Sequence, residues 1–175
     1  HMEDVWFQPV LNQDNSSGKV SVIMKVTAPE KQNVDARFVL TDREGTVITE
    51  KCLQLQGRDG IFTGTIHTDV QNIKLWDNHS PYLYHACVEL IEDKGEVLEV
   101  VPYDIGFRRL DVIDKVIYLN GKRLVITGVN RHEWNPKTGR CIGMQEMTAD
   151  IDCMLRNNIN AVRTCHYPDQ IPWYY

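Results

Sequence analysis

The side chains best suited to chemistry gather in three short clusters in the last third of the chain. They are residues 128–133 (GVNRHE), residues 163–168 (RTCHYP) and residues 173–175 (WYY). The first two combine imidazole and guanidinium groups with amide, carboxylate or thiol groups, which bind polar ligands and transfer protons. A buried polar group without a partner costs about 1–3 kcal/mol, so these groups either form a site or pair with one another. A functional site and structural ion pairing both remain open at this point.

Familiar catalytic motifs do not account for these clusters. The sequence contains no nucleophile elbow, phosphate-binding loop or dinucleotide-binding glycine pattern, and His132-Glu133 lacks the second histidine of a zinc-protease helix. Glu133 and Asp150 form no recognisable carboxylate pair. Cys165 and His166 are adjacent along the chain, which is a poor arrangement for a nucleophile and its base. The elements that position these residues must therefore indicate their role.

The pattern around the first two clusters predicts a βαβ unit. Residues 127–132 read as a buried strand and residues 160–163 as a short apolar strand. Between them lies one apolar helix stripe, which consists of Met147, Ile151, Met154 and Leu155. Strand, helix and strand in this order imply parallel strands. Both clusters then follow the carboxyl ends of these strands, where the loops of α/β barrels converge into active sites.

Upstream, residues 5–110 have the two-residue period of strands, interrupted by turn signals such as Asp59-Gly60 and Asp93-Lys94-Gly95. The predicted strands are 5–11, 20–27, 36–40, 46–55, 61–70, 82–90 and 96–101. This pattern predicts a mainly β fold, a seven-stranded antiparallel β-sandwich of immunoglobulin-like size over residues 3–110. Residues 111–175 are expected to form a second domain, which opens with predicted strands 112–119 and 123–126 joined by a tight turn at Asn120-Gly121.

The net charge and the lengths of the apolar runs exclude several classes of protein. The 175 residues carry a formal net charge of −5, with 19 Lys and Arg against 24 Asp and Glu, so we expect no nucleic-acid partner. No apolar run approaches the roughly 18 residues of a membrane helix, and no membrane partner is expected.

The five cysteines lack metal-site or disulfide spacing, and we expect buried, reduced thiols and a cytoplasmic rather than secreted protein. His67, His79 and His85 are expected to be surface histidines or satisfied core residues. His1 precedes Met2, which is typical of a cloning remnant, so a missing leader peptide carries no information.

These motifs resemble glycoside hydrolase family 2. Residues 119–122 (LNGK) with 128–133 resemble the family's first barrel strand, and residues 157–168 (NNINAVRTCHYP) resemble its second. The end of its immunoglobulin-like domain is similar to residues 74–76, 81–84 and 104–108 (KLW, PYLY and DIGFR). Pro136, Gly139 and Trp173-Tyr174 are closer to the β-galactosidase branch than to the β-glucuronidase or β-mannosidase branches. The resemblance implies that residues 111–175 are the βαβ start of a truncated (β/α)8 barrel.

The resemblance also implies roles for individual residues. His132 and His166 match histidines that line the galactose pocket and stabilise the transition state, as the sugar ring flattens toward an oxocarbenium ion. Arg163 matches an arginine beside the catalytic nucleophile, where its charge keeps a carboxylate ionised. Asn130, Arg131 and Glu133 are expected to support these groups rather than to touch the reacting atoms. Cys165 is expected to have a packing role.

By the same resemblance, the longer protein is a retaining β-galactosidase that hydrolyses terminal non-reducing β-D-galactose residues. Retention needs two carboxyl groups about 5–5.5 Å apart, and a complete barrel needs about 250 residues. The family's two catalytic glutamates lie on later barrel strands and have no match here, so we expect the chain alone to be inactive. Its implied partners are a galactoside, the rest of the barrel and further subunits. We expect no metal or cofactor in these residues, with magnesium and sodium as candidates in the longer protein.

Two other interpretations stay open. One is a non-catalytic β-sandwich module that binds carbohydrate or another protein, in which aromatic residues stack on sugar rings. The candidates for stacking are Trp6, Trp76, Tyr82 and Tyr84, although a sandwich core also uses such residues. The other is a structural domain that positions its neighbours in a longer protein.

Overall fold

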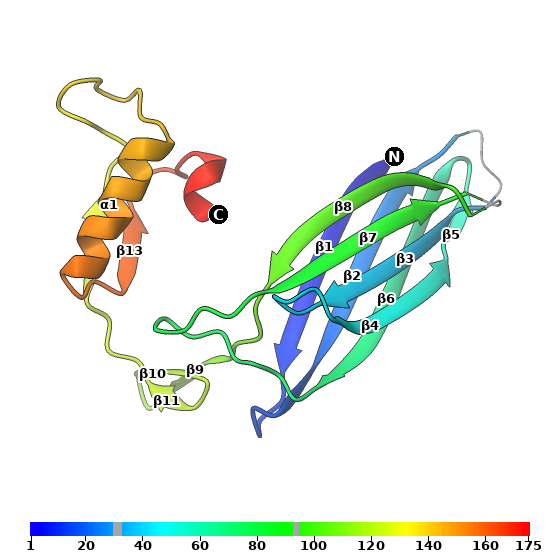
Figure 1. Cartoon of the computed structure of the whole chain (residues 1–175), viewed down its shortest axis with the longest axis horizontal. Coiled ribbons are helices and arrows are strands. Elements are labelled where there is room, and N and C mark those ends of the chain that lie inside the picture. The colour runs from blue at the N-terminus through cyan, green and yellow to red at the C-terminus, as the bar shows by residue number, and fades with distance from the viewer. Residues whose placement is uncertain (30–32, 93–94) are drawn as a thin grey trace. The chain divides into compact units, whose positions relative to one another are not determined.

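The computed structural model describes residues 1–29, 33–92 and 95–175. The chain forms two compact units, His1–Arg123 and Leu124–Tyr175, and each is described by itself. Figure 1 shows the first unit as a sandwich of strands followed by a small sheet, and the second as a helix beside short strands. None of the helices in the described part of the chain is long and apolar enough to cross a membrane.

The first unit is built on a two-layer antiparallel sandwich. Within the described residues, one sheet has the order β1-β2-β6-β5 and the other has the order β4-β3-β7-β8. The strands of the first sheet are β1 (Met2–Leu11), β2 (Ser17–Thr27), β6 (Ile61–Gln71) and β5 (Gln56–Arg58). Those of the second are β4 (Val47–Gln54), β3 (Asp35–Thr41), β7 (Tyr84–Ile91) and β8 (Val97–Ile105). The predicted mainly β sandwich is therefore confirmed.

The core lies between the two sheets and follows the predicted alternation. On β2 the buried side chains are Val20, Val22, Met24 and Val26, with polar or more exposed residues between them. Phe38 on β3 and Val88 on β7 are opposite each other in the register and are fully buried. Successive residues of a strand face opposite sides of its sheet, so the apolar residues at every second position close this core.

The sandwich has one more described strand than the seven predicted. The segment predicted as one strand, 46–55, ends in the structure at Gln54, and Leu55 is buried between β4 and β5. After Leu55 the chain pairs with β6 in the opposite sheet. A change of sheet within one extended segment leaves the two-residue period nearly intact, which is why the sequence pattern does not reveal it. The predicted turn at Asp93-Lys94 lies outside the described residues.

After the sandwich, the chain forms a three-stranded meander of β9 (Leu110–Ile113), β10 (Val116–Leu119) and β11 (Lys122–Arg123). The predicted Asn120-Gly121 hairpin turn is confirmed, with φ of 53° and 79° at the two residues. The prediction of a single strand over 112–119 is wrong. Asp114 and Lys115 both have positive φ and turn the chain between β9 and β10. Lysine is not a typical residue for this backbone region, so the turn leaves little trace in the sequence.

Asn120 links this meander to the sandwich. Its side chain is buried; Oδ1 accepts a hydrogen bond from the Arg109 backbone N–H at 2.8 Å, and Nδ2 donates to the Trp76 carbonyl at 3.0 Å. The Asn15 side chain in turn donates to the Asn120 carbonyl at 2.9 Å. One residue thus supplies both a left-handed turn and buried bonds to two other segments of the unit.

Replacing Asn120 by alanine should destabilise the first unit by about 2–4 kcal/mol, because it removes two buried hydrogen bonds and puts alanine in a left-handed conformation. Urea unfolding followed by tryptophan fluorescence measures the effect. Asn72 is the matched control, since it is exposed and has a similar φ of 53°. Asn72→Ala should destabilise the unit only by the free energy of placing alanine in a left-handed conformation, about 1 kcal/mol. Equal losses in the two variants would mean that the side-chain bonds of Asn120 contribute nothing.

The second unit contains β12 (Gly128–Arg131), α1 (Met144–Arg156), β13 (Ala161–Thr164) and the short 3₁₀ helix η1 (Ile171–Tyr174). β12 and β13 pair in parallel, from Gly128 opposite Ala161 to Arg131 opposite Thr164. The predicted βαβ unit is confirmed. The Glu146 carboxylate accepts a hydrogen bond from the Gly143 N–H at 3.0 Å and so helps to begin the helix.

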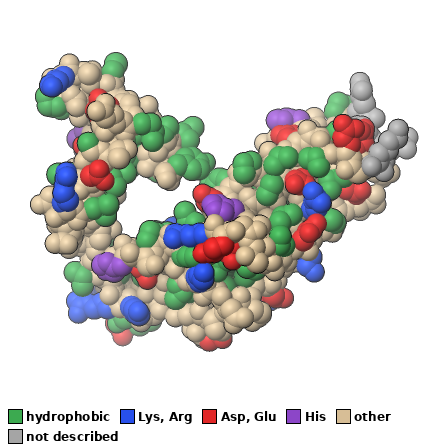
Figure 2. Space-filling model, in the orientation of Figure 1, with side chains coloured by type: hydrophobic (Ala, Val, Ile, Leu, Met, Phe, Trp, Pro, Cys, Tyr) green, Lys and Arg blue, Asp and Glu red, His purple; other side chains and the backbone are tan. Residues whose placement is uncertain are grey.

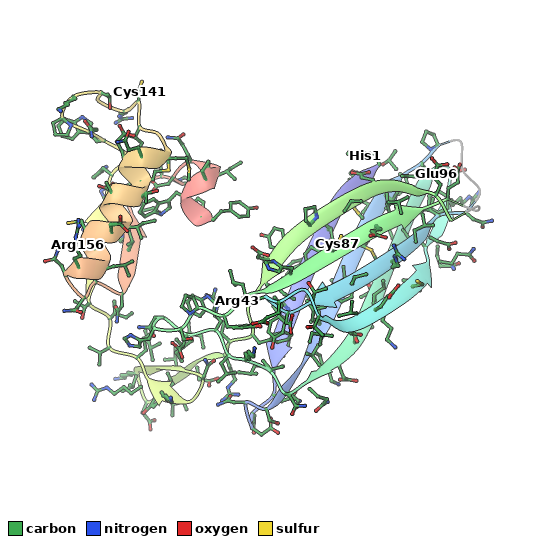
Figure 3. The ribbon with its side chains drawn as sticks, in the orientation of Figure 1. His1, Arg43, Cys87, Glu96, Cys141 and Arg156 are labelled. Atoms are coloured by element: carbon green, nitrogen blue, oxygen red, sulfur yellow. The ribbon has the colours of Figure 1, made fainter. Side chains whose placement is uncertain are left out.

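The prediction of buried cysteines is wrong for three of the five. Cys165 is buried and Cys87 on β7 is half-buried, but Cys52, Cys141 and Cys153 are exposed. Cys52 lies on the outward-facing positions of the edge strand β4, and Cys141 lies in the loop before α1 (Figure 3). An edge strand or a helix with one covered face has many exposed positions, and the general tendency of cysteine to be buried does not identify them.

Candidate functional site

The candidate site lies at the carboxyl ends of β12 and β13. His132 directly follows β12, and Cys165 and His166 directly follow β13. The backbone N–H of Cys165 donates to the Arg131 carbonyl at 2.8 Å, which extends the parallel pairing by one bond. The two imidazole rings consequently lie 5.4 Å apart, centroid to centroid, at an angle of 79°. Both histidines are exposed and can contact a ligand.

Arg163 joins His166 to the buried thiol of Cys165. Its guanidinium Nη1 lies 3.3 Å from His166 Nδ1 and 3.2 Å from Cys165 Sγ. A guanidinium only donates hydrogen bonds, so His166 Nδ1 must accept and the neutral ring carries its proton on Nε2. His166 therefore offers an N–H donor on the side of the ring away from Arg163.

Tyr167 continues this group of side chains. Its hydroxyl lies 3.4 Å from His132 Nδ1, and the two ring centroids are 6.0 Å apart. The Arg140 guanidinium lies 5.8 Å from the centre of the Tyr167 ring. The loops after the two strands thus hold the imidazoles through contacts made between the loops themselves.

Arg131 lies beneath the site and is buried. Its Nη1 donates to Asp169 Oδ2 at 2.7 Å, and its Nε donates to Asp150 Oδ2 on α1 at 3.0 Å. Its guanidinium carbon also lies 3.8 Å from the centre of the Trp173 ring. The Asp169 side chain is fully buried, with an exposed fraction of 0%. This ion pair ties β12 to the loop after β13.

The other two predicted supporting residues lie apart from this ion pair. Glu133 accepts a hydrogen bond from the Gln170 backbone N–H at 3.0 Å, which joins the two loops a second time. Asn130 is exposed on β12 and is opposite Arg163 in the register. Asn130 and Arg163 both line a cavity of about 370 Å³ over this small sheet.

The partners of Arg131, which are Asp169, Asp150 and Trp173, were not predicted from the sequence. Asp169 is the residue after the RTCHYP cluster, and nothing in its spacing from Arg131 indicates a pair. Composition offers the one signal in the sequence for this pair. A carboxylate next to a cluster of cationic residues, as Asp169 is, is a candidate ion-pair partner for one of them.

Most of the candidate sugar-stacking residues of the first unit pack in its interior or against other side chains. Tyr82 and Tyr84 belong to the buried core, and the Arg108 guanidinium lies 4.5 Å from the centre of the half-buried Trp76 ring. Trp6 is exposed. His85 Nδ1 lies 2.6 Å from Asp104 Oδ1, as expected of a satisfied surface histidine.

The donor chemistry of the site bears on the metals that the family resemblance suggests. Among the described residues, one group of three potential ligands comes together, with atoms of His132, Cys165 and His166 all within 4.8 Å of one another. Magnesium and sodium prefer oxygen ligands, whereas this group offers sulfur and nitrogen. These residues do not fit either ion, and no step of a reaction is assigned to one here.

Two family models match the chain and divide it into two parts. Residues 1–108 match the model "Glycosyl hydrolases family 2", and residues 110–175 match "Glycosyl hydrolases family 2, TIM barrel domain". The chain belongs to glycosyl hydrolase family 2. The parallel pair β12–β13 with its intervening helix lies within the part that matches the barrel domain of this family, and that part begins with the meander β9–β11.

The chain is similar to proteins named as β-galactosidase large subunits. The chain is 44% identical over 176 residues to the β-galactosidase large subunit of Lactobacillus acidophilus, covering 100% of this chain and 27% of that protein. It is 46% identical to the β-galactosidase large subunit of Leuconostoc lactis, covering 99% of this chain and 27% of that protein. The chain thus spans about a quarter of the length of these relatives.

Solved structures share the fold. A β-glucuronidase of Ruminococcus gnavus is 28% identical, with a TM-score of 0.78 over 99% of this chain and 27% of that chain. A β-glucuronidase of Parabacteroides merdae reaches a TM-score of 0.84 at 23% identity, covering 97% of this chain and 21% of that chain. At this level of identity the second likeness concerns the fold alone.

Proposed function

We propose that the chain is the part of a retaining β-galactosidase that supplies the sandwich and the opening of the catalytic barrel. The observation that carries this proposal is the pair of exposed imidazoles, 5.4 Å apart at the carboxyl edge of two parallel strands. The named relatives at 44–46% identity support galactosides rather than glucuronides as the substrate class.

In this proposal His132 and His166 bind hydroxyl groups of the terminal galactose. The Nε2–H of His166 donates to a sugar oxygen, because Nδ1 is occupied by Arg163. Such bonds accelerate the reaction to the extent that they strengthen as the ring flattens toward the oxocarbenium-like transition state. Arg163 provides positive charge near the reacting centre, where it keeps a carboxylate nucleophile ionised. The two catalytic glutamates belong to polypeptide outside these 175 residues, and the chain alone is inactive.

Two kinds of protein partner follow from the same proposal. Apolar side chains lie at the surface of the second unit, including Val162 on β13 and Leu155 on α1, and Figure 2 shows such side chains on its visible face. We propose that the remaining barrel covers this surface, because a two-stranded parallel sheet is normally covered by further strands and helices. The two relatives described above are both large subunits, which suggests a small subunit as a further partner.

The experiment is a comparison of substrates on a protein extended to the length of its relatives. It should hydrolyse p-nitrophenyl β-D-galactoside with a kcat/KM at least about 100-fold above that for the β-D-glucuronide, the discrimination expected of a site built around a specific hydroxyl. The 175-residue chain should hydrolyse neither. A preference for the glucuronide would contradict the substrate class, and turnover by the short chain would contradict the assignment of the glutamates to other polypeptide.

A further inference from the structure

Beside the two histidines proposed to bind the sugar, the site contains a buried thiol, Cys165, to which sugar binding assigns no role. Cys165 Sγ lies with a nitrogen of each of His132 and His166 in one group within 4.8 Å. We propose that these three residues bind a borderline-soft divalent cation, Zn²⁺ being the reference ion, with water as the fourth ligand. Thiolate sulfur and imidazole nitrogen are ligand types that Zn²⁺ binds, and three protein ligands with water in the fourth position are the arrangement of catalytic zinc sites. Binding of the ion does not depend on the galactosidase proposal.

The distances need only a small rearrangement. Zn–S and Zn–N bonds of about 2.3 and 2.0–2.1 Å place tetrahedral ligand atoms roughly 3.3–3.6 Å apart. The three atoms therefore have to approach one another by little more than about 1 Å, which rotation of the two imidazoles can supply. Both imidazoles are exposed, whereas Cys165 has an exposed fraction of 1%. The ion would enter from the histidine side and meet the thiol at the base of the site.

The Arg163 guanidinium, itself a cation, already contacts two of the three proposed ligands. Lone pairs of Cys165 Sγ and His166 Nδ1 both point at Arg163 Nη1, at 3.2 and 3.3 Å. Two acceptors that converge on a guanidinium can also converge on a metal ion, provided that the guanidinium leaves. Arg163 is exposed, so its side chain can move into solvent. Arg163 thus competes with the ion. Replacing Arg163 should therefore raise the affinity for the ion, whereas replacing a ligand should lower it.

The protons balance simply. The Cys165 thiol donates to the Arg163 carbonyl, Sγ to O 3.3 Å, and loses this proton to solvent when the metal–sulfur bond forms. The two imidazoles bind through neutral nitrogen atoms, and formation of the metal–sulfur bond accounts for one proton released per ion bound.

The test is calorimetric titration of the 175-residue chain with ZnCl₂, together with absorption spectra after addition of Co²⁺. We expect one site with a thiolate-to-cobalt charge-transfer band. Cys165→Ser should lower Zn²⁺ affinity at least about tenfold and abolish the band, since even loss of an outer hydrogen-bond partner of a metal ligand costs about 10–100-fold. Cys153→Ser is the matched control because Cys153 is an exposed cysteine in the same unit, and it should change neither.

Two further variants distinguish the loss of a metal ligand from unfolding of the unit. His132→Gln alters an exposed ligand and should lower the affinity as Cys165→Ser does. Arg163→Gln removes the competing cation and should raise the affinity several-fold, which a variant that merely unfolds the unit cannot do. The proposal is overturned if Cys165→Ser and His132→Gln bind Zn²⁺ as the unchanged chain does, or if Arg163→Gln binds it more weakly.

Discussion

Replacing His166 by alanine in the extended protein should lower kcat/KM for a β-galactoside about 100- to 1,000-fold, the usual effect of losing one preorganised donor to the transition state. The imidazole is held between Arg163 and the His132 ring, so its Nε2–H is already oriented before substrate arrives. Since the bond strengthens as the sugar ring flattens, most of the loss should fall on kcat rather than on KM.

His79→Ala is the matched control, because His79 is an exposed histidine of the sandwich and should leave kcat and KM unchanged. Steady-state kinetics with p-nitrophenyl β-D-galactoside measures both variants. A rise in KM with kcat unchanged would mean that His166 only binds the ground state. Equal kinetics in the two variants would remove His166 from the site altogether.

Replacing Asp169 by asparagine should destabilise the second unit by about 3–5 kcal/mol, because it leaves the Arg131 charge buried without its closest partner. The pair is well enclosed, with side-chain exposed fractions of 4% for Arg131 and 0% for Asp169. Trp173 covers the Arg131 guanidinium, so its fluorescence should report the loss. Hydrogen exchange at the amides of β12 and β13 should accelerate in parallel.

Asp152→Asn makes the same chemical change at an exposed position of α1 and should alter exchange in β12 and β13 little. The double variant Arg131→Met with Asp169→Leu should recover part of the lost stability, since it removes both buried charges together. If Asp169→Asn left exchange in the two strands unchanged, the ion pair would not be what holds the loops at the end of β13.

The sandwich could be predicted because its evidence is local. Alternating residues such as Val20, Val22 and Met24 report the period of a strand and its buried face, whichever strand lies next to it. The Asn120-Gly121 turn could be predicted for a similar reason, since both residues tolerate the positive φ that the turn requires. The turn at Asp114-Lys115 has the same geometry but uses a lysine, and the sequence therefore suggests one continuous strand.

The residues of the site were predicted by type and by place at the ends of two strands, and their contacts depend on the tertiary structure. His132 and Tyr167 are 35 residues apart in the chain, and Arg131 and Asp169 are 38 apart. The order strand, helix, strand implies that the two strand ends meet, because such a crossover pairs them in parallel.

The amino-acid sequence alone thus determined the strand faces, the helix stripe and the main turn, because each is encoded within a few neighbouring residues. It also determined the edge at which the imidazoles gather, because the order strand, helix, strand implies a parallel pair. The folded chain alone decided that Asp169 neutralises Arg131, that the Tyr167 hydroxyl lies beside His132, and that Cys165 lies with both imidazoles. These pairings depend on the register of β12 with β13 and on which groups are buried together, and polar side chains far apart in a sequence carry no mark of their partners.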